Sequence, residues 1–436
     1  MGDVDTIFAP ASGFGRAAVA VVRISGPRAV AVLEVLTRRP PPPPRRLSLR
    51  ILRDPGSGEV LDQALVAWMP GPGTFTGEDS VELQLHGGPA VRMAVLRTLG
   101  SIPGLAPAEP GAFTRRAFLN GRMDLTEVEG LADLIDAETE AQRRQAMRQL
   151  DGGLGRLVEG WRKALLDVLA MTEAALDFSD EGDVDDAALS QAGLAAARDV
   201  GRAIRAALAD GRRGERLRDG LTVVLAGAPN AGKSTLLNAL AKRDAAIVSS
   251  VPGTTRDAIE VRCDLGGLPV VLVDTAGLRE SADSIEVEGI ARSRRRIAQA
   301  DLVLWLVPPE GSDEPAPAGA VVVRTKADLA PSGPGGGLSI SAVTGQGLGA
   351  LLDAIEAAAQ AALGAGDAVV TRERQRRALE ACADHLDRAI GGAGALPAEL
   401  VAEDLRLAVR ALGVVAGRVG VEEVLDRLFA SFCIGK

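Results

Sequence analysis

The spacing of hydrophobic positions changes along the chain, and each change predicts a different kind of structure. Before about residue 118, short apolar runs such as 19–25 and 64–70 alternate with segments rich in Gly and Pro, which predicts strands joined by loops. From about residue 120, and again after about residue 370, apolar residues recur with helical spacing. The continuous apolar runs between these two stretches are typical of buried parallel strands.

These continuous runs alternate with helical segments, which predicts a doubly wound α/β domain. The four runs are residues 221–227, 270–274, 302–307 and 320–325. Helical segments flank this domain on both sides, so we expect it to be inserted into a helical domain. The predicted fold is multidomain, with an α+β N-terminal domain (1–118), an all-α helical domain (119–218 and 367–436) and an inserted α/β domain (219–366).

Two local signals place helices within the helical domain. Thr126 and Glu129 have the spacing of a capping box, which predicts that a helix begins near Thr126. Apolar stripes predict two helices closer to the C-terminus, one with Val401, Leu405, Ala408 and Leu412, the other with Val421, Val424, Leu425, Leu428 and Phe429. The acidic residues between 180 and 186 are expected to form a solvated loop.

Composition argues against several functional classes. The three cysteines are far apart and the chain has two histidines, so neither a disulfide framework nor a His-rich metal site is expected. The net charge of −9 and the absence of Tyr argue against a basic nucleic-acid coat and against stacking of single-stranded bases. The sequence shows no secretory signal and no uncharged apolar run of about 18 residues, so we expect a cytoplasmic protein with no membrane partner.

Residues 227–234, GAPNAGKS, form a complete phosphate-binding loop motif between a predicted strand and a predicted helix. The glycines of this motif allow backbone N–H groups to surround phosphate oxygens, and the helix N-terminus adds its dipole. Lys233 is expected to bind the β- and γ-phosphates, and the Ser234 hydroxyl to bind Mg²⁺.

Two further motifs follow predicted strands of the same domain. Asp274 begins the sequence DTAG, where a carboxylate can hold Mg²⁺ through water and Gly277 can donate its N–H to a γ-phosphate. Asp328 ends the sequence TKAD, where a carboxylate can accept both N1–H and the exocyclic amine of guanine, which selects GTP over ATP. Ser341 and Ala342 are expected to add a backbone contact to the guanine oxygen.

These motifs resemble the TRAFAC class of GTPases, whose base-recognition motif is NKxD. Thr325 stands at the Asn position, and its hydroxyl can replace part of the bracing of the phosphate-binding loop, so we expect altered nucleotide affinity with guanine selection intact. Lys326 is one of five lysines in the chain, which supports a required role beside the base. Thr255, in the sequence GTTRD, is the expected switch residue that binds Mg²⁺. Leu278 stands where related enzymes have a Gln that orients water, so another residue or a partner must do so.

Longer segments resemble the MnmE (TrmE) family of tRNA-modification GTPases over essentially the whole chain. Besides the motifs above, they include DTAGLRE and the segment FCIGK at residues 432–436. In the N-terminal half they are RISG at 23–26, PGPGTFTGED at 70–79, HGGP at 86–89 and RAFLNGRMDL at 116–125. The predicted insertion of one domain into another also matches this family.

The resemblance implies an activity that the residues alone do not define. Members of the family hydrolyse GTP with Mg²⁺ and K⁺, and their G domains dimerise across the nucleotide. As a heterotetramer with the FAD-dependent protein MnmG, the homodimer adds an aminomethyl-type (carboxymethylaminomethyl) group to C5 of the wobble uridine of certain tRNAs. The one-carbon unit comes from a tetrahydrofolate derivative, in its 5,10-methylene or 5-formyl form, bound by the N-terminal domain.

The resemblance also implies site residues. Folate would contact Arg23, Glu82, Arg122 and Lys436, near Cys433 of the C-terminal motif, with Arg122 where the family has Lys. K⁺ would contact Asn230, Ser249, Val251 and Thr254, Mg²⁺ would contact Ser234 and Thr255, and Glu286 would orient the attacking water as the catalytic residue. GTP would contact Asn230, Ala231, Gly232, Lys233, Ser234, Thr235, Ser249, Ser250, Val251, Pro252, Gly253, Thr254, Thr255, Asp274, Thr275, Ala276, Gly277, Thr325, Lys326, Ala327, Asp328, Ser341, Ala342 and Val343.

Three alternatives to a modification enzyme remain at this point. A regulatory or ribosome-assembly GTPase would carry a basic RNA-binding module, and none is visible in the sequence. Asp328 argues against a P-loop ATPase, and the complete phosphate-binding loop argues against a scaffold with a vestigial site. Arg clusters within 212–218, 292–296 and 372–377 are expected to be solvated helix faces, with a tRNA-binding patch as the alternative.

Overall fold

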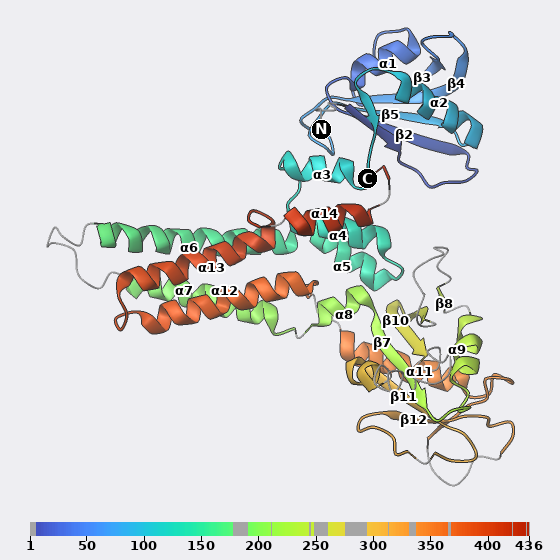
Figure 1. Cartoon of the computed structure of the whole chain (residues 1–436), viewed down its shortest axis with the longest axis vertical. Coiled ribbons are helices and arrows are strands. Elements are labelled where there is room, and N and C mark those ends of the chain that lie inside the picture. The colour runs from blue at the N-terminus through green and yellow to red at the C-terminus, as the bar shows by residue number, and fades with distance from the viewer. Residues whose placement is uncertain are drawn as a thin grey trace, which may run out of the picture. The chain divides into compact units, whose positions relative to one another are not determined.

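The computed structural model of the chain forms two compact units, which we describe separately. It describes residues 6–177, 191–210, 212–243, 246–247, 260–274, 294–312, 314–330, 337–364, 368–420, 422–432 and 434–435. One unit comprises Met1–Ala132 and Gly413–Lys436, and the other comprises Asp133–Leu412 (Figure 1). The predicted domain boundaries at 118, 218 and 366 stay a prediction. Among the described residues, no helix is both long and apolar enough to cross a membrane.

A mainly antiparallel sheet lies at the centre of the first unit. Its strands are β1 (Thr6–Pro10), β2 (Val19–Ser25), β3 (Ser48–Arg53), β4 (Val60–Met69), β5 (Ser80–His86) and β6 (Leu105–Pro107). They lie in the order β3-β4-β5-β2-β1-β6, and the pairing of β1 with β6 is parallel. Successive side chains of a strand point to opposite faces, so one face of the sheet can pack in a hydrophobic core while the other carries polar side chains.

Two helices cover one face of this sheet. Helices α1 (Ala29–Thr37) and α2 (Pro89–Ser101) supply buried residues to the same cluster as Val22, Ile24 and Leu83 of the strands. Arg23 lies between Val22 and Ile24 on β2 and is paired in register with Glu82 on β5. Arg23 and Glu82 therefore lie on the opposite face of the sheet, away from α1 and α2.

Helices α3 (Ala112–Leu119), α4 (Leu125–Asp136) and α14 (Glu422–Ser431) complete this unit, except that the last turn of α4 belongs to the second unit. The start of α3 lies against α14, because a Cβ atom at Gly111 would come within 2.8 Å of the carbonyl oxygen of Phe429. Leu425, Leu428 and Phe429 of the second predicted stripe are buried, whereas Val421 lies outside the described residues. The close approach at Gly111 requires a residue without a side chain, which Gly provides.

The capping box predicted at Thr126 is wrong, and the box lies two residues earlier. Asp124 caps α4, since its Oδ1 accepts a hydrogen bond from the backbone N–H of Glu127 at 2.9 Å. Glu127 Oε2 in turn accepts from the backbone N–H of Asp124 at 2.7 Å. Thr126 is fully buried in the first turn and donates its hydroxyl to Asp124 at 2.7 Å. A carboxylate can cap a helix as well as a hydroxyl can, so Asp124 takes the position that the spacing suggested for Thr126.

The helical part of the second unit contains helices of 7 to 25 residues. These are α5 (Glu140–Leu150), α6 (Gly153–Asp177), α7 (Gln191–Leu208), α8 (Arg213–Asp219), α12 (Glu373–Gly392) and α13 (Ala398–Ala416). Helix α7 contacts both α6 and α12. The stripe predicted from residue 401 to residue 412 is buried on α13, as its spacing indicated. The acidic residues 180–186 lie outside the described residues.

The second unit also contains the inserted α/β sheet. Its strands are β7 (Leu221–Gly227), β8 (Ala246–Ile247), β9 (Glu260–Leu265), β10 (Leu268–Asp274), β11 (Leu302–Val307), β12 (Val321–Arg324) and β13 (Leu338–Ser339). They lie in the order β13-β12-β11-β7-β10-β9-β8, and β10, β7, β11, β12 and β13 are mutually parallel. The four predicted apolar runs are the four central parallel strands.

The edge formed by β9 and β8 was not predicted, and it makes the sheet mixed rather than wholly parallel. Strand β9 is antiparallel to β10, and the two strands are joined by Gly266 and Gly267. Both glycines have positive φ, 60° and 83°, as a two-residue hairpin turn requires. The Gly-Gly pair between two short apolar segments was therefore a hairpin signal in the sequence.

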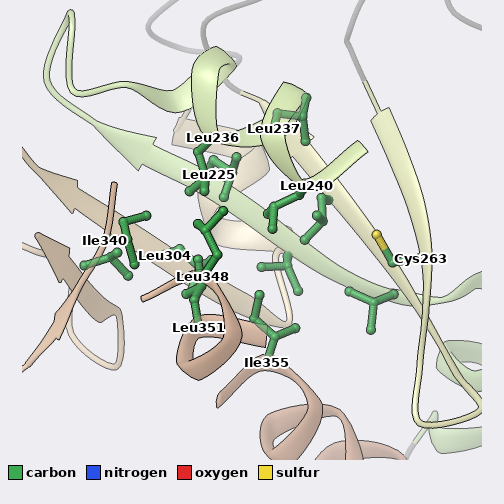
Figure 2. Close-up of a cluster of buried hydrophobic side chains, with 14 of the residues drawn as sticks. Leu225, Leu236, Leu237, Leu240, Cys263, Leu304, Ile340, Leu348, Leu351 and Ile355 are labelled. Atoms are coloured by element: carbon green, nitrogen blue, oxygen red, sulfur yellow. The ribbon is translucent and has the colours of Figure 1, made fainter. Parts of the chain in front are cut away.

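Apolar residues fill both faces of this sheet. On one face, side chains of α9 (Lys233–Ala241) and α11 (Leu348–Leu363), such as Leu236, Leu240 and Leu351, pack against the strands (Figure 2). On the other face, Val224 and Val271 pack with the helical residue Ile297. Helical cover on both faces is what defines a doubly wound domain, so the predicted fold class is confirmed.

The carboxylate of Asp133, whose side chain is 13% exposed, lies where the chain enters and leaves this sheet. Asp133 Oδ1 accepts from Arg218 Nε, just before β7, at 2.8 Å and from Arg372 Nη2, just before α12, at 2.5 Å. Burial, followed by the negative charge of Asp133, raises the pKa of the neighbouring Asp136. Asp133 therefore connects the segment that enters the α/β part with the segment that leaves it.

Helix α5 adds three buried glutamines to this junction. Gln142 Nε2 donates to the carbonyl of Arg218 at 2.9 Å, Gln145 Nε2 donates to the carbonyl of Gly214 at 3.1 Å, and Gln149 Nε2 donates to the hydroxyl of Thr371. The backbone N–H of Ala141, at the start of α5, also donates to the carbonyl of Gly267 at 3.2 Å. Residues 142, 145 and 149 share one face of the helix, so that face is bonded along its length to the segments that lead into and out of the α/β part.

Candidate functional site

The phosphate-binding loop lies between β7 and α9, as its sequence predicted. Asn230 and Gly232 have φ values of 62° and 89°, so the backbone turns through left-handed conformations before α9 begins at Lys233. Asn is one of the residues that adopts this conformation most readily. At Gly227 a Cβ atom would come within 2.4 Å of the carbonyl oxygen of Leu306 on β11, so this position must be Gly. The result is a compact loop ahead of the N-terminus of α9, the arrangement that binds phosphate.

Lys233 and Thr325 brace this loop from two sides. Lys233 Nζ donates to the carbonyls of Gly227 and Ala228, each at 2.9 Å, and the side chain is largely buried. Thr325 Oγ1 donates to the carbonyl of Ala231 at 2.8 Å, which is the bracing that we expected its hydroxyl to provide. A neutral hydrogen bond of this kind stabilises by about 1 kcal/mol.

Ser234 and Asp274 meet at the carboxyl end of β10. The Ser234 hydroxyl donates to Asp274 Oδ2 at 2.5 Å, and Asp274 is fully buried. Strands β7 and β10 are parallel neighbours, so their carboxyl ends place the phosphate-binding loop beside this carboxylate. A hydroxyl oxygen and a carboxylate oxygen are the ligand types that Mg²⁺ prefers, so the residues present fit this ion.

The TKAD segment follows β12 at the same edge of the sheet. The backbone N–H of Ala327 donates to the carbonyl of Ile340 at 3.0 Å, which ties the TKAD turn to the segment that leads to Ser341. Ser341 is fully buried and accepts from the N–H of Thr344 at 3.1 Å. Asp328 is exposed on this turn, as a side chain that binds a base must be. The structure thus places residues 325–328 and 341–343 next to one another, 13 or more positions apart in the chain.

Lys326 makes one ion pair within this loop region. Its Nζ lies 3.6 Å from Glu310 Oε1, and the Glu310 side chain is 70% exposed. At such exposure the pair contributes little to stability, so it does not by itself account for a Lys at this position. The backbone of Lys326 has φ 56°, an unusual value for a residue other than Gly.

Part of the predicted nucleotide site lies outside the described residues. The described members are residues 230–235, 274, 325–328 and 341–343. The segment from Ser249 to Thr255 and Thr275, Ala276, Gly277, Leu278 and Glu286 lie outside. The contacts predicted for those residues stay predictions.

A second polar site lies on the face of the first unit's sheet that α1 and α2 leave open. Arg23 donates to Glu82 Oε1 from Nε at 3.2 Å and from Nη2 at 2.9 Å, and each side chain is about one quarter exposed (26% and 25%). Both bonds end on Oε1, so among the described residues the other oxygen of Glu82 has no hydrogen-bond partner. An arginine and a carboxylate held side by side can donate to one part of a ligand and accept from another.

Two phenylalanines that the sequence analysis did not single out flank Arg23. The guanidinium carbon of Arg23 lies 5.7 Å from the ring centre of Phe75 and 5.8 Å from that of Phe113. Phe113 is fully buried, whereas Phe75 is 38% exposed. Phe75 lies in the segment 70–79, so an aromatic residue within a Gly-rich loop was the available signal.

The other predicted folate residues are described only in part. Arg122 is exposed, and its Cγ lies 3.3 Å from the place that a Cβ of Gly77 would occupy, so its stem packs on the segment 70–79. Gly435 lies against the end of β1, because its Cβ would come within 1.9 Å of the carbonyl oxygen of Pro10. Cys433 and Lys436 lie outside the described residues.

The two described cysteines are poor candidates for thiol chemistry. Burial raises the pKa of Cys263 to about 11 and that of Cys382 to about 12. At neutral pH both are protonated thiols, whereas the reactive species is the thiolate.

A parallel sheet that carries a phosphate-binding loop, a buried Asp bonded to the Ser of that loop and a TKAD turn at one edge is that of a P-loop GTPase. Comparison with known proteins narrows this class. The family model described as the MnmE helical domain matches residues 125–433, and the model described as the GTP-binding protein TrmE N-terminus matches residues 6–122. The chain belongs to the MnmE family of tRNA modification GTPases.

Individual relatives agree along the full length. The tRNA modification GTPase MnmE of Methylobacterium sp. (strain 4-46) is 78% identical, with 99% of this chain and 100% of that protein covered. The tRNA modification GTPase MnmE of Rhodospirillum rubrum is 53% identical, again with 99% and 100% covered. Among solved structures, the G domain of the T. maritima FeoB iron transporter is 27% identical and covers 32% of this chain and 99% of that one, at a TM-score of 0.23.

Proposed function

We propose that the chain hydrolyses GTP with Mg²⁺ and K⁺ and takes part in modification of the tRNA wobble uridine. With the FAD-dependent partner MnmG, it would add a carboxymethylaminomethyl-type group to C5, with a tetrahydrofolate derivative as the one-carbon donor. The observation that carries the GTPase half is the meeting of the phosphate-binding loop with buried Asp274 through the Ser234 hydroxyl. Membership of the MnmE family supports the tRNA half.

The chain's own groups divide the work on GTP. Lys233 and the N-terminus of α9 would neutralise phosphate charge, while Ser234 and Thr255 would hold Mg²⁺ with the help of Asp274, to which Ser234 is bonded. Asp328 selects guanine, because an adenine ring offers no matching pair of donors. Mg²⁺ supplies charge that offsets the charge developing on the transferred phosphate.

K⁺ would supply the charge that an arginine finger supplies in other GTPases, and Glu286 would take the role of their water-orienting Gln. Leu278 is apolar and cannot orient water, so Glu286 is the proposed residue for that step. Asn230, Ser249, Val251 and Thr254 would hold K⁺ beside the phosphates. Asn230 has a left-handed φ, so the phosphate-binding loop turns at this residue, beside the proposed phosphate and K⁺ positions.

The folate site is proposed on the open face of the first unit's sheet. Arg23 and Glu82 form its described centre, and Arg122 packs on the neighbouring segment 70–79. The contact of Gly435 with Pro10 supports a role for Lys436, because Pro10 pairs with Val22, the neighbour of Arg23. A cationic side chain at that point would suit a folate carboxylate.

The proposed assembly is a homodimer that binds MnmG as a heterotetramer, acts on tRNA and works in the cytoplasm. The decisive experiment is removal of the gene from its host, followed by nucleoside analysis of bulk tRNA. We expect the C5-modified wobble uridine to be lost and to return when the gene is restored. Unchanged tRNA with altered ribosomal subunit profiles would instead favour a ribosome-assembly GTPase.

A further inference from the structure

Three segments that are far apart in the sequence meet in one polar network of the first unit. They are 23–26, 70–79 and 116–125, and the proposed function uses only Arg23 and Arg122 from them. The network that they form is centred on Glu78. Its members lie beside the Arg23–Glu82 pair, since Ser25 follows Arg23 by two residues on the same face of β2.

Glu78 connects a strand to a helix. Its Oε2 accepts from the Ser25 hydroxyl at 3.0 Å and from Arg116 Nη1 at 2.7 Å. The hydroxyls of Ser25 and Thr76 lie 2.7 Å apart, and both residues are fully buried. The buried Ser25 hydroxyl bonds to both Thr76 and Glu78, so loss of the Glu78 carboxylate removes one partner from Ser25 and the ion pair from Arg116.

The same network fixes the residues on both sides of Phe75. Thr74 donates its hydroxyl to the carbonyl of Glu78 at 2.6 Å, and Asn120 Nδ2 donates to the carbonyl of Thr76 at 2.7 Å. The backbone of Phe75 is therefore held between two bonded neighbours, although its ring is 38% exposed. The exposed ring keeps a defined place near the Arg23 guanidinium, 5.7 Å from its centre.

We propose that Glu78 is a positioning residue of the folate site: through Ser25 and Arg116 it holds the segment 70–79 so that Phe75 presents an aromatic face beside Arg23 and Glu82. Phe75 together with Arg23 and Glu82 suits a ligand that has a planar ring with hydrogen-bonding edges. Such a ligand ring can stack on the Phe75 side chain while Arg23 and Glu82 bond to its edge. This inference rests on the proposed function. It adds residues to which that function assigned no role.

The test compares Glu78→Gln and Arg116→Gln in the full chain. Glu78→Gln keeps the size of the side chain, Arg116→Gln shortens it, and each removes one charge, so the Kd of 5-formyltetrahydrofolate should rise about tenfold. The double variant should bind about as weakly as either single variant, because both changes remove the same ion pair. Arg115→Gln is the control, since Arg115 lies on the same helix, is half exposed and pairs with the exposed Asp426 at 3.6 Å.

Amide hydrogen exchange of the ligand-free protein supplies a second readout. In Glu78→Gln, exchange within residues 74–79 should accelerate while the Tm and the GTPase rate stay close to those of the unsubstituted chain. Wild-type affinity and wild-type exchange in Glu78→Gln would overturn the positioning role and leave the folate site intact. No binding of 5-formyltetrahydrofolate by the unsubstituted chain would overturn the folate site and the positioning role together.

Discussion

The two candidate sites lie on sheets of opposite design. The nucleotide site lies at the carboxyl edge of a parallel sheet, where the loops after β7 and β12 and the end of β10 come together. The Arg23–Glu82 pair lies in the middle of two antiparallel strands, on the face that α1 and α2 do not cover. At the edge, short contiguous motifs supply both backbone and side-chain groups. On the face, single side chains from separate strands form the described centre of the site.

This difference affects how each site responds to substitution. The phosphate-binding loop depends on backbone conformation at Gly227, Asn230 and Gly232, and much of its binding comes from N–H groups that a side-chain change leaves in place. The Arg23–Glu82 pair is held by the side chains themselves, 59 positions apart in the chain. If the two sites are independent, a substitution in one of them should leave ligand binding at the other unchanged.

Removal of the Lys233 ammonium should have the largest effect. Lys233→Ala loses at least two charge-assisted contacts to phosphate, so the affinity for GTP should fall about 10³-fold. Fluorescent GTP-analogue titration measures the loss, and Lys242→Ala, an exposed Lys at the end of the same helix, should bind normally. If the sites are independent, Lys233→Ala binds folate with unchanged affinity. A parallel loss of folate binding would show that the two sites are coupled.

A change at Asp328 should alter which base is accepted. Asp328→Asn replaces one acceptor by a donor, so the affinity for GTP should fall about 10²-fold, while xanthosine triphosphate, which has a carbonyl in place of the guanine amine, should gain affinity. Competition binding with both nucleotides measures this exchange. Asp353→Asn, at an exposed position on α11, is the matched control. Equal losses for both nucleotides would show that Asp328 does not contact the base.

On the antiparallel sheet, Arg23 is the corresponding target. Arg23→Ala leaves the Glu82 carboxylate without its partner and should weaken 5-formyltetrahydrofolate binding about 30-fold. Isothermal titration calorimetry measures the affinity, and GTP hydrolysis measured in parallel should be unchanged. Arg97→Ala, on the solvent side of α2, serves as the control. Normal folate binding by Arg23→Ala would place the ligand elsewhere.

The smallest effect is expected at Thr325. Thr325→Val removes the hydrogen bond to the Ala231 carbonyl and keeps the shape, so the affinity for GDP should fall about fivefold. Thr325→Ser keeps the hydroxyl and should restore most of the affinity. A loss in Thr325→Ser as large as that in Thr325→Val would assign the effect to packing rather than to the hydrogen bond.

The same contrast explains what could be predicted from the sequence. Strands β7, β10, β11 and β12 were predicted because burial on both faces leaves continuous apolar runs. The phosphate-binding loop was predicted because its residues are contiguous. The antiparallel edge of β9 and β8 was missed, although Gly266 and Gly267 marked its hairpin.

The network around Glu78 could not be predicted in this way. Ser25, Glu78 and Arg116 come together only through strand register and helix packing, which no local spacing records. The capping box failed for a related reason, because Asp124 and Thr126 are both suitable residues and their geometry decides between them. Arg23 and Glu82 were named only through the family resemblance.

Asp133 has a consequence for how the chain could be rearranged. Arg218 precedes the inserted sheet and Arg372 follows it, and both guanidinium groups bind the same carboxylate oxygen. The residues at which the chain enters and leaves the insertion are therefore close together. Closing so short a gap requires little loop entropy, so a linker of a few residues could replace the whole insert. The G domain is in this sense an exchangeable module, and the helical domain has the geometry to accept another domain at the same place.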